Sequence, residues 1–337
     1  MTDTNDDRVA LDLLIRGFQV SRTIRLVADL GVADKIAPDA PCTVAELATA
    51  CGVMPGPLLR ALRCLAAFGI FHVDADGTVA HTPRSRLLRT DVPNSLHHGA
   101  RFWTAPGSWR AWEKLDAALD GKSPHEAAWG TNRFAYLRDH PEEARLFDAF
   151  MASFPDDRHD AVARAYDFSQ TRLIVDVGGG NGETLRRILA RFPEARGIIF
   201  DREDVVAAVP SEALADGRIT AQGGSFFDGV PSRADLYMFV RVLHNWADEN
   251  VLRILRTCRA AVEPHGRLLI VDHVLNPDPS RGRPTEYLID MQMLAMFGSA
   301  RERTEADFRD VLASAGFGLR RVIPTCSPVS ILEATPV

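Results

Sequence analysis

The glycine-rich segment L-I-V-D-V-G-G-G-N-G, residues 173–182, restricts the fold of this chain more than any other stretch. An apolar, β-branched run ends at Gly178, and apolar residues at helical spacing resume after Asn181. The segment therefore predicts a strand, a tight turn and a helix. Glycine has no Cβ and tolerates positive φ, so the backbone of such a turn can approach a bound ligand closely.

The spacing of these glycines narrows the choice of ligand. In the dinucleotide fingerprint G-x-G-x-x-G, counted from Gly178, Glu183 stands where the third glycine belongs. The phosphate loop of nucleotide triphosphatases requires a lysine after its last glycine, and none follows here. The pattern G-x-G-x-G suits a nucleoside without a pyrophosphate, although a purely structural turn would have the same sequence.

An acidic residue supports the nucleoside interpretation. The apolar run 197–200 ends in Asp201, about 20 residues beyond the glycines, where a ribose-binding carboxylate lies at the tip of the next parallel strand. An ordinary strand-ending turn residue would occupy the same position, so Asp201 by itself does not distinguish the two readings.

The composition excludes several classes of protein. With 337 residues, of which 46% are hydrophobic and 25% charged, we expect a globular protein with room for two domains. The net charge of −6 argues against a nucleic-acid partner, and no apolar run approaches the roughly 20 residues that span a bilayer. Without a recognisable signal peptide, we expect a cytoplasmic protein with no membrane partner. Five cysteines form no C-x-x-C pair and ten histidines show no ligand spacing, so we expect no metal site.

The first 98 residues have the outline of a winged helix. Apolar residues at helical spacing over Arg8–Leu30 predict a first helix, and Thr43 with Glu46 forms a capping box for the next. A further amphipathic helix over Pro57–Phe68 precedes two strand-like runs that flank a D-G turn. Winged helices often bind DNA through their second helix, but here that helix offers only two arginines. We therefore expect this domain to form a homodimer rather than to bind DNA.

The second half of the chain alternates between apolar strand-like runs and helical stretches. This alternation predicts a doubly wound, mostly parallel sheet with helices on both faces, an α/β fold of the Rossmann type, over residues 166–337. The last two runs predict an antiparallel hairpin at the sheet edge, and the aromatic-rich residues 99–165 a helical connector that contributes to a ligand pocket. The predicted strands are Ile174–Val177, Gly197–Phe200, Arg218–Gln222, Ala234–Val240, Arg267–Val271, Leu319–Ile323 and Val329–Glu333.

His244 is the strongest catalytic candidate. It follows a predicted strand in the segment R-V-L-H-N-W-A-D. Ligands of parallel α/β sheets bind beyond the carboxyl ends of the strands, so Gly178, Asp201 and His244 are expected to border one crevice. An imidazole with an ordinary pKa of about 6.5 can accept a proton near neutral pH. A loop histidine without any catalytic role would look the same in the sequence.

Five separated motifs, in this order and spacing, resemble the small-molecule O-methyltransferases that include plant phenolic methyltransferases and bacterial polyketide and antibiotic-tailoring enzymes. The resemblance extends over nearly the whole chain. It implies S-adenosylmethionine as methyl donor, a homodimer formed through the N-terminal domain, and methyl transfer to a hydroxyl of a phenolic, polyketide or quinone-like natural product. The motifs are V-D-V-G-G-G-N-G, the F-D that ends at Asp201, G-S-F-F-D-G-V-P, R-V-L-H-N-W and R-E-R-T-E-A-D-F.

The resemblance also implies roles for individual residues. His244 corresponds to the general base, and Asp272 and Glu302 to the two carboxylates that flank it. A phenol has a pKa of about 10, so a base that removes its proton favours attack on the methyl group. The residues implied to bind the cofactor are Asp176, Gly178, Gly180, Gly182, Asp201, Arg202, Gly224, Ser225, Phe226 and Arg241.

The residues that we expect to contact the acceptor are largely apolar. Methionines and aromatic rings make adaptable walls for flat ligands, although the same residues at helical spacing would also serve as core. The candidates are Trp103, Phe150, Met151, Asn245, Met293, Met296 and Phe297.

Three residues depart from the pattern of the resembled family. Ser225 and Val240 stand where many relatives have an aspartate and a lysine, and Asn245 where an aspartate usually follows the histidine. These departures concern contacts to adenine and to the acceptor, not the base. Two other functions stay open: a tailoring enzyme of the same fold with non-methylating chemistry such as hydroxylation, which would lack the base, and a winged-helix regulator, which would need a basic recognition helix.

Overall fold

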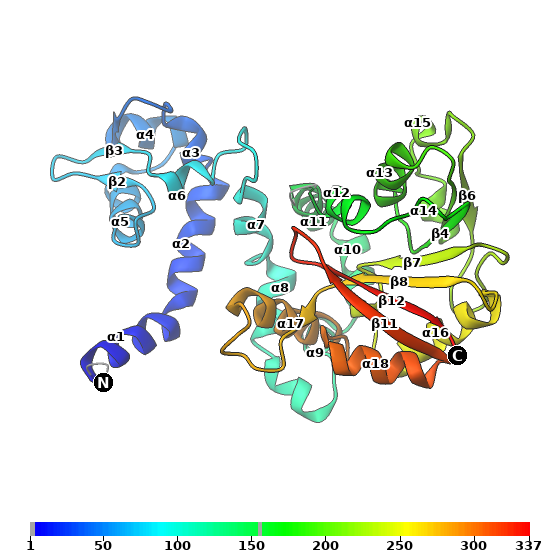
Figure 1. Ribbon diagram of the computed structural model, residues 1–337. Helices are drawn as coiled ribbons and strands as arrows, with labels where there is room; N and C mark the ends of the chain where they lie inside the picture. The colour runs from blue at the N-terminus through cyan, green and yellow to red at the C-terminus, as the bar shows by residue number, and fades with distance from the viewer. Residues whose placement is uncertain (1–3, 154–156) are drawn as a thin grey trace. The chain divides into compact units, whose positions relative to one another are not determined.

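The computed structural model describes residues 4–153 and 157–337. By its internal contacts the chain forms two units (Figure 1). The N-terminal unit comprises Met1–Glu113 and Ala128–Pro155, and the sheet unit comprises Lys114–Ala127 and Asp156–Val337. Residues of the connector predicted over 99–165 thus belong to both units, and the predicted domain limits at 98 and 165 remain predictions.

The N-terminal unit begins with two helices where the sequence predicted one. Helix α1 (Thr4–Ile15) and helix α2 (Gly17–Asp29) are separated at Arg16, whose ψ of 4° is not helical. The prediction of one uninterrupted helix was wrong because apolar spacing continues across Gly17, a residue of low helix propensity that permits the break. Several apolar side chains of this region are exposed, among them Leu14 (77%) and Phe18 (56%).

The winged-helix pattern is confirmed in the same unit. Helix α4 (Val44–Cys51) starts at the predicted Thr43 capping box, and helix α5 (Pro55–Ala66) follows it. Strands β2 (His72–Val73) and β3 (Thr78–Ala80) form the predicted hairpin, and β3 also pairs with β1 (Cys42–Thr43). Strand β1 was not predicted, because two residues carry no periodicity. The core of this module is built from Leu47, Leu58, Leu62, Leu65, Phe71 and Val79.

Further helices complete the N-terminal unit, and a buried carboxylate joins three of them. A buried ion pair joins Arg133 Nη1 to Glu143 Oε1 at 2.9 Å, and the same carboxylate accepts from the Tyr136 hydroxyl and the Gly107 N–H. These bonds satisfy a carboxylate that would otherwise be costly to bury. The helices are α3 (Val32–Lys35), α6 (Pro83–Arg86), α7 (His97–Phe102), α8 (Pro106–Trp112), α10 (Arg133–Asp139) and α11 (Pro141–Ser153). Helix α9 (Pro124–Trp129) spans the boundary between the units.

The sheet unit contains the predicted mostly parallel sheet. Its strand order is β11-β12-β8-β7-β4-β5-β6, with β4 to β8 parallel and the β11–β12 hairpin antiparallel at one edge. Each strand lies within three residues of its predicted limits. The strands are β4 (Leu173–Val177), β5 (Arg196–Asp201), β6 (Ile219–Gly223), β7 (Leu236–Val240), β8 (Arg267–Asp272), β11 (Phe317–Pro324) and β12 (Ser330–Pro336).

Helices cover both faces of this sheet, as predicted (Figure 1). Helices α12 (Asp157–Ala165) and α13 (Glu183–Arg191) contribute to one apolar core, and α16 (Asp248–Ala261) and α18 (Glu305–Ser314) to the other.

Among the described residues, no helix combines the length and apolar character needed to cross a bilayer. The remaining elements are α14 (Glu203–Val206), α15 (Ser211–Leu214), α17 (Pro284–Phe297), the 3-10 helices η1 (Leu115–Asp120) and η2 (Leu243–Asn245), and the paired strands β9 (Val274–Leu275) and β10 (Arg303–Thr304).

Candidate functional site

The glycine turn after β4 has the backbone geometry that the sequence predicted. Gly178, Gly180 and Gly182 have φ values of 73°, 57° and 75°. A Cβ at Gly178 would lie 2.7 Å from Val242 Cγ2, and one at Gly182 would overlap the side chain of Ile199. A Cβ at Gly180 would meet nothing within 4 Å. Gly178 therefore packs tightly against the loop after β7 and Gly182 against β5, whereas Gly180 leaves open space.

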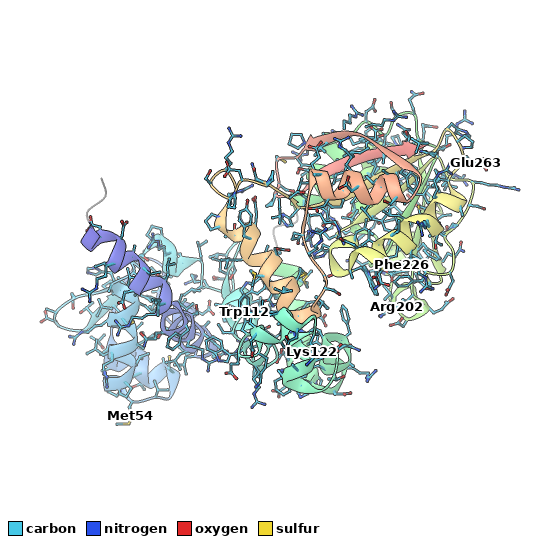
Figure 2. The ribbon with its side chains drawn as sticks, turned by 90° about the horizontal axis from the view of Figure 1, so that it is seen from below. Met54, Trp112, Lys122, Arg202, Phe226 and Glu263 are labelled. Carbon is cyan, nitrogen blue, oxygen red and sulfur yellow. The ribbon has the colours of Figure 1, made fainter. Side chains whose placement is uncertain are left out.

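Asp201 lies at this turn, at the carboxyl end of β5. Its Oδ2 accepts a hydrogen bond from the Gly180 N–H at 3.0 Å, and its Oδ1 accepts from the Arg202 N–H at 2.7 Å. Its carbonyl accepts from the Gly224 N–H, which brings the end of β6 to the same edge. Arg202 and Phe226, which follow these two strands, are labelled at one edge of the sheet unit in Figure 2. Of the residues implied to bind the cofactor, Asp201 thus contacts the glycine turn directly, and Gly224 is joined to the turn through Asp201.

A buried carboxyl group lies directly beneath the turn. Asp176 is 2% exposed, and its Oδ1 has no hydrogen-bond partner within the described part of the chain. Burial, together with the nearby charge of Asp201, raises the pKa of Asp176 to about 7. A Cβ on Gly179 would lie 2.8 Å from Asp176 Cγ. An incompletely bonded carboxyl under an open glycine turn fits a ligand with a cationic group, as S-adenosylmethionine has.

The structure brings the three implied catalytic side chains together at the ends of the central strands. His244 lies in η2, just after β7, and its side chain is 11% exposed. Its Nδ1 is 3.1 Å from Oε1 of Glu302, which directly precedes β10. Asp272 ends β8. One imidazole nitrogen of His244 and one carboxylate oxygen each of Asp272 and Glu302 all lie within 4.8 Å of one another. Side chains separated by up to 58 positions in the sequence thus form one cluster.

Arg241 lies between the two carboxylates of this cluster. Its Nη1 donates to Asp272 Oδ1 at 2.5 Å, and its Nη1 and Nη2 donate to Glu302 at 3.1 and 2.8 Å. The residue has a φ of 56°, unusual for a side chain with a Cβ, and this turns the chain after β7. Resemblance implied a cofactor contact for Arg241, and no local signal in R-V-L-H indicated the ion pairs. Its positive charge balances one of the two carboxylates.

The electrostatics of the cluster differ between its carboxyl groups. Burial raises the pKa of Asp272, and the charge of Arg241 offsets this only in part. Burial also acts to raise the pKa of Glu302, but the hydrogen bond with His244 and the charge of Arg241 outweigh it and lower that pKa. An ionised Glu302 only accepts hydrogen bonds, so its contact with Nδ1 requires a proton there and leaves Nε2 with its lone pair.

A second nitrogen approaches the same imidazole atom. Arg241 Nη2 is 3.0 Å from His244 Nδ1, and this contact could be a hydrogen bond only if Nδ1 lacked a proton. Nη2 already donates to Glu302 at the shorter distance of 2.8 Å, so the tautomer with a proton on Nδ1 satisfies both side chains. The neighbouring His273, absent from the predicted site, has its pKa lowered to about 4 by burial and by the Arg241 charge, and is neutral near pH 7.

The predicted acceptor residues belong to both units. In α17 of the sheet unit, Met296 is buried and Met293 and Phe297 are partly exposed. The Asn245 amide donates to the carbonyls of Arg241 and Val242 at 3.3 Å, so it braces its own loop.

The three acceptor candidates of the N-terminal unit differ in exposure. The Phe150 ring stacks on Phe102 with centroids 4.6 Å apart, and Trp103 and Met151 are each 39% exposed. The packing of Phe150 agrees with the core interpretation, while the other two have free surface. Their contact with an acceptor stays a prediction.

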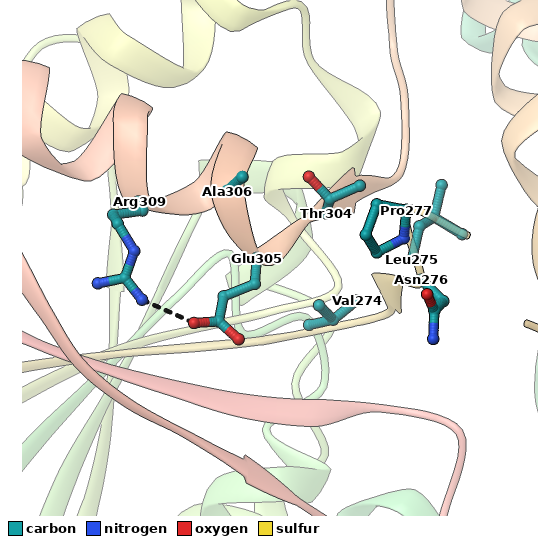
Figure 3. A pocket seen from close by; sticks show the side chains of 8 residues that line it. All are labelled: Val274, Leu275, Asn276, Pro277, Thr304, Glu305, Ala306 and Arg309. Carbon is teal, nitrogen blue, oxygen red and sulfur yellow. Dashed lines mark hydrogen bonds and ion pairs between the residues drawn. The ribbon is translucent and has the colours of Figure 1, made fainter. Parts of the chain in front are cut away.

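A surface pocket between β9 and the start of α18 was not predicted (Figure 3). Its charged side chains, Glu305 and Arg309, pair with each other at 2.6 Å. No residue that lines the pocket belongs to the His244 cluster. The lining residues are Val274, Leu275, Asn276, Pro277, Thr304, Glu305, Ala306 and Arg309.

Comparison with protein families gives two matches that together span most of the chain. Residues 112–318 match the O-methyltransferase domain, and residues 13–91 match the O-methyltransferase dimerisation domain. The first match includes the glycine turn and the complete His244 cluster. The second covers the winged helix, for which dimerisation had been predicted.

Two characterised relatives align over almost their whole length. A phenazine O-methyltransferase of Lysobacter antibioticus is 38% identical over 96% of this chain and 95% of its own. A phenazine-1-carboxylate N-methyltransferase of Pseudomonas aeruginosa is 32% identical over 92% of this chain and 92% of its own.

Solved structures show the same fold at similar identity. The mitomycin 7-O-methyltransferase superimposes with a TM-score of 0.88 at 32% identity, covering 99% of this chain and 98% of that one. An O-methyltransferase from neocarzinostatin biosynthesis, solved with S-adenosylmethionine and 2-hydroxy-5-methyl naphthoic acid, gives a TM-score of 0.78 at 30% identity over 94% and 96% of the two chains. The chain therefore belongs to the family of S-adenosylmethionine-dependent O-methyltransferases.

Proposed function

We propose that this enzyme methylates a hydroxyl group of an aromatic natural product, with His244 as general base. The observation that carries the proposal is the contact between His244 Nδ1 and the ionised Glu302, which leaves Nε2 able to accept a proton. Relatives that methylate phenazine, mitomycin and naphthoate compounds support a flat aromatic acceptor and a role in antibiotic tailoring. The dimerisation domain supports a homodimer.

The cofactor fits the residues at the glycine turn. Asp176, whose Oδ1 has no hydrogen-bond partner among the described residues, and the open space at Gly180 would receive the methionine part, and Asp201 would accept from the ribose hydroxyls. Arg202, Gly224, Ser225 and Phe226 would line the adenine. S-adenosylmethionine supplies, when bound, a methyl group on a positively charged sulfur.

His244 would remove the proton that makes the acceptor a poor nucleophile. A phenol with a pKa of about 10 is almost fully protonated at neutral pH, and transfer of its proton to Nε2 gives the reactive phenolate. Arg241, Asp272 and Glu302, when ionised, together carry one net negative charge next to the imidazole. A proton that arrives on His244 neutralises this buried charge, so the cluster stabilises the imidazolium.

Methylation of a ring nitrogen is a second candidate, favoured by the relative named as an N-methyltransferase. An aromatic ring nitrogen attacks through a lone pair and has no proton to lose, so it does not require His244. The two reactions therefore predict different dependence on this residue: O-methylation is lost in His244→Ala, and N-methylation persists.

The test begins with the cofactor and proceeds to the acceptor. Calorimetric titration with S-adenosylhomocysteine is expected to give micromolar binding, while NAD and ATP as controls give none. Hydroxybenzoates, hydroxynaphthoates, hydroxyphenazines and unhydroxylated phenazine carboxylates are then assayed for a mass increase of one methyl group. Methylation confined to the hydroxylated compounds supports the proposal. Binding of NAD in place of the homocysteine derivative, or methylation of nitrogen compounds alone, would contradict it.

A further inference from the structure

Arg303 is a buried guanidinium that follows Glu302 in the chain. Its side chain is 0% exposed and lies in β10, which pairs with β9. A buried arginine is stable only when its donors are satisfied, because removal of the charge from water is costly. The bonds that satisfy it therefore indicate what the residue holds in place.

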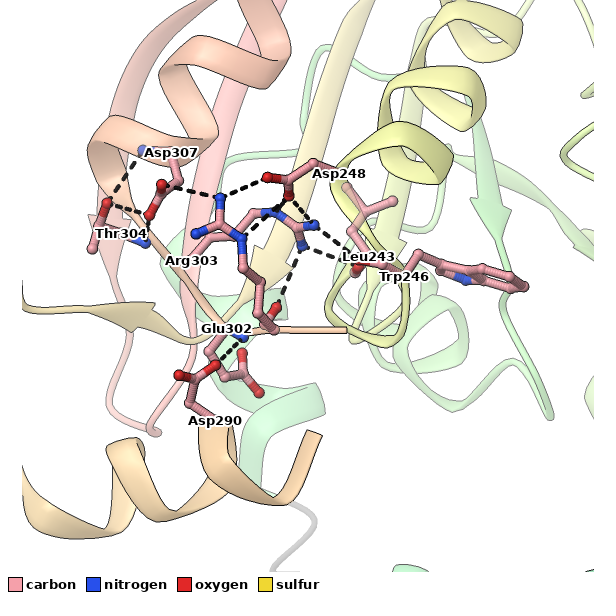
Figure 4. A network of polar contacts seen from close by, with 9 residues as sticks. Leu243, Trp246, Asp248, Asp290, Glu302, Arg303, Thr304 and Asp307 are labelled. Atoms are coloured by element: carbon pink, nitrogen blue, oxygen red, sulfur yellow. Dashed lines mark hydrogen bonds and ion pairs between the residues drawn. The ribbon is translucent and has the colours of Figure 1, made fainter. Parts of the chain in front are cut away.

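Four hydrogen bonds of this guanidinium hold the loop that carries His244 and the start of the helix that follows it (Figure 4). Nη1 donates to the Leu243 carbonyl at 3.1 Å, and Nη2 donates to the Trp246 carbonyl at 2.9 Å. Nε and Nη2 also donate to Oδ1 of Asp248, the first residue of α16, at 3.0 and 2.6 Å. The guanidinium thus bonds the backbone on both sides of His244 and the helix that follows.

Glu302 and Arg303 act on the same loop through different atoms. Glu302 contacts the His244 side chain, and Arg303 contacts the backbone of its neighbours. The backbone N–H of Glu302 in turn donates to Asp290 Oδ1 of α17 at 2.8 Å, which holds the backbone of Glu302 in place. The distance between the imidazole and Glu302 is therefore set by two adjacent residues, Glu302 just before β10 and Arg303 at its start.

We propose that Arg303 is a positioning residue that holds the His244 loop at hydrogen-bonding distance from Glu302. Only a planar guanidinium can donate to two carbonyls and a carboxylate at once, and a lysine ammonium is too short and too compact to bridge them. The proposal rests on the proposed role of His244 as base. It predicts that Arg303 affects the proton affinity of the imidazole without touching acceptor or cofactor.

Arg301 provides a matched control. It lies two residues earlier and bonds the same carboxylate, with Nη2 2.7 Å from Asp248 Oδ2 and 3.1 Å from Asp307 Oδ1. Its side chain is 41% exposed. None of its bonds in the described part of the chain reaches the carbonyls beside His244. Arg301→Lys therefore perturbs the same ion-pair network but leaves the bonds to the His244 loop intact.

The experiment compares Arg303→Lys with Arg301→Lys in the full-length protein. We expect Arg303→Lys to lower kcat by about 10- to 100-fold on the most active hydroxylated compound of the panel, because a displaced catalytic group loses activity on this scale. Affinity for S-adenosylhomocysteine is expected to change less than about 3-fold, since the glycine turn is untouched. Arg301→Lys is expected to retain kcat within about 2-fold.

A pH titration separates positioning from a general structural role. A loosened contact with Glu302 stabilises the imidazolium less, so the acid limb of the kcat profile and the ¹⁵N titration of the His244 ring both move to lower pH in Arg303→Lys. A partly unfolded enzyme would lose kcat without any such movement. The ring signal is assigned as the one that is missing in His244→Ala.

Two outcomes distinguish failure of this proposal from failure of the proposed function. If His244→Ala keeps O-methylation but the ring titration still moves in Arg303→Lys, His244 is not the base and the positioning holds. If both lysine variants have the ring titration and kcat of the wild type, the positioning proposal is overturned.

A second variant covers the case in which Arg303→Lys does not fold. Asp248→Asn removes the carboxylate that orients the Arg303 guanidinium but leaves its bonds to the carbonyls. We expect a several-fold lower kcat and a smaller movement of the ring titration in the same direction, with Arg301→Lys unchanged. An Asp248→Asn enzyme indistinguishable from Arg301→Lys would overturn the proposal.

Discussion

The cofactor turn and the His244 cluster lie at the same ends of the parallel strands but are built in different ways. The turn is made of consecutive residues, and its shape follows from positive φ at three glycines. The cluster is made of four side chains from the ends of three strands, with partners up to 61 residues apart in sequence. Local backbone geometry therefore forms the first, whereas ion pairs between distant segments form the second.

This difference predicts that a substitution in one region impairs the function of that region and leaves the other region intact. A substitution in the turn strains the backbone and lowers cofactor affinity. A substitution in the cluster changes the proton affinity of the imidazole and lowers turnover, with the cofactor site intact.

The largest effect is expected from Gly182→Ala. Its φ of 75° and the overlap of a Cβ with Ile199 distort the turn, so affinity for S-adenosylhomocysteine falls by about 100-fold or more, which corresponds to strain of about 3 kcal/mol. Gly217→Ala is the control, because its φ is also positive, at 68°, and a Cβ there would meet nothing within 4 Å. Calorimetry on both variants checks this. Equal affinities in the two would show that the turn does not bind the cofactor.

Glu302→Gln is expected to lower kcat by about 10- to 100-fold, because the neutral amide stabilises the imidazolium less than the carboxylate does. The acid limb of the pH profile moves to lower pH, because loss of the adjacent negative charge disfavours the protonated imidazole. Cofactor affinity is measured in parallel and should match the wild type. An unchanged kcat would remove Glu302 from the mechanism.

Asp176→Asn is expected to stabilise the protein at alkaline pH. The pKa of Asp176 is raised from 3.8 to about 7, so the folded state binds the proton more tightly and stability falls as pH rises between these values. An amide cannot ionise. The free energy of unfolding of the variant therefore exceeds that of the wild type by up to about 4 kcal/mol at pH 8 and by little at pH 4.

Urea unfolding at both pH values measures this gain. Affinity for S-adenosylhomocysteine at pH 8 is expected to fall at the same time, because the variant loses the carboxylate that we propose as the partner of its cationic group. A gain that is independent of pH would contradict the burial argument.

The smallest effect is expected from His273→Asn. This histidine adjoins Asp272, but burial keeps its pKa at about 4, so it carries no proton in the pH range of the reaction. We expect kcat within about 2-fold of the wild type and an unmoved acid limb. If the acid limb moved, the group that titrates in it would be His273 and not His244.

The same contrast explains how much the sequence could predict. The strands and the turn have local signals, namely apolar runs and glycine spacing, and their positions were predicted within a few residues. The two-residue strand β1 and the break at Arg16 have weak local signals and were missed or misread. In the cluster, resemblance identified His244, Asp272 and Glu302, and the structure brings them together.

The ion-pair role of Arg241 in the cluster, and the role of Arg303 beside it, could not be found in this way. Arg241 and Arg303 stand among ordinary arginines of R-V-L-H and R-E-R-T, and their roles depend on partners about 60 positions away. Only the pairing of β9 with β10 and the order of β7 and β8 in the sheet bring these partners close. The sequence therefore predicts the groups that react, and the fold is needed to find the groups that position them.

The most direct test of the central claim compares His244→Ala with the wild type in two measurements on one preparation. We expect kcat for methyl transfer to a hydroxylated aromatic compound to fall by about 100-fold or more, because general-base catalysis contributes at least that much. Affinity for S-adenosylhomocysteine should stay within about 2-fold, since the glycine turn and Asp201 do not depend on the imidazole. Loss of cofactor binding, or an unchanged kcat, would show that His244 is a structural residue and not the base.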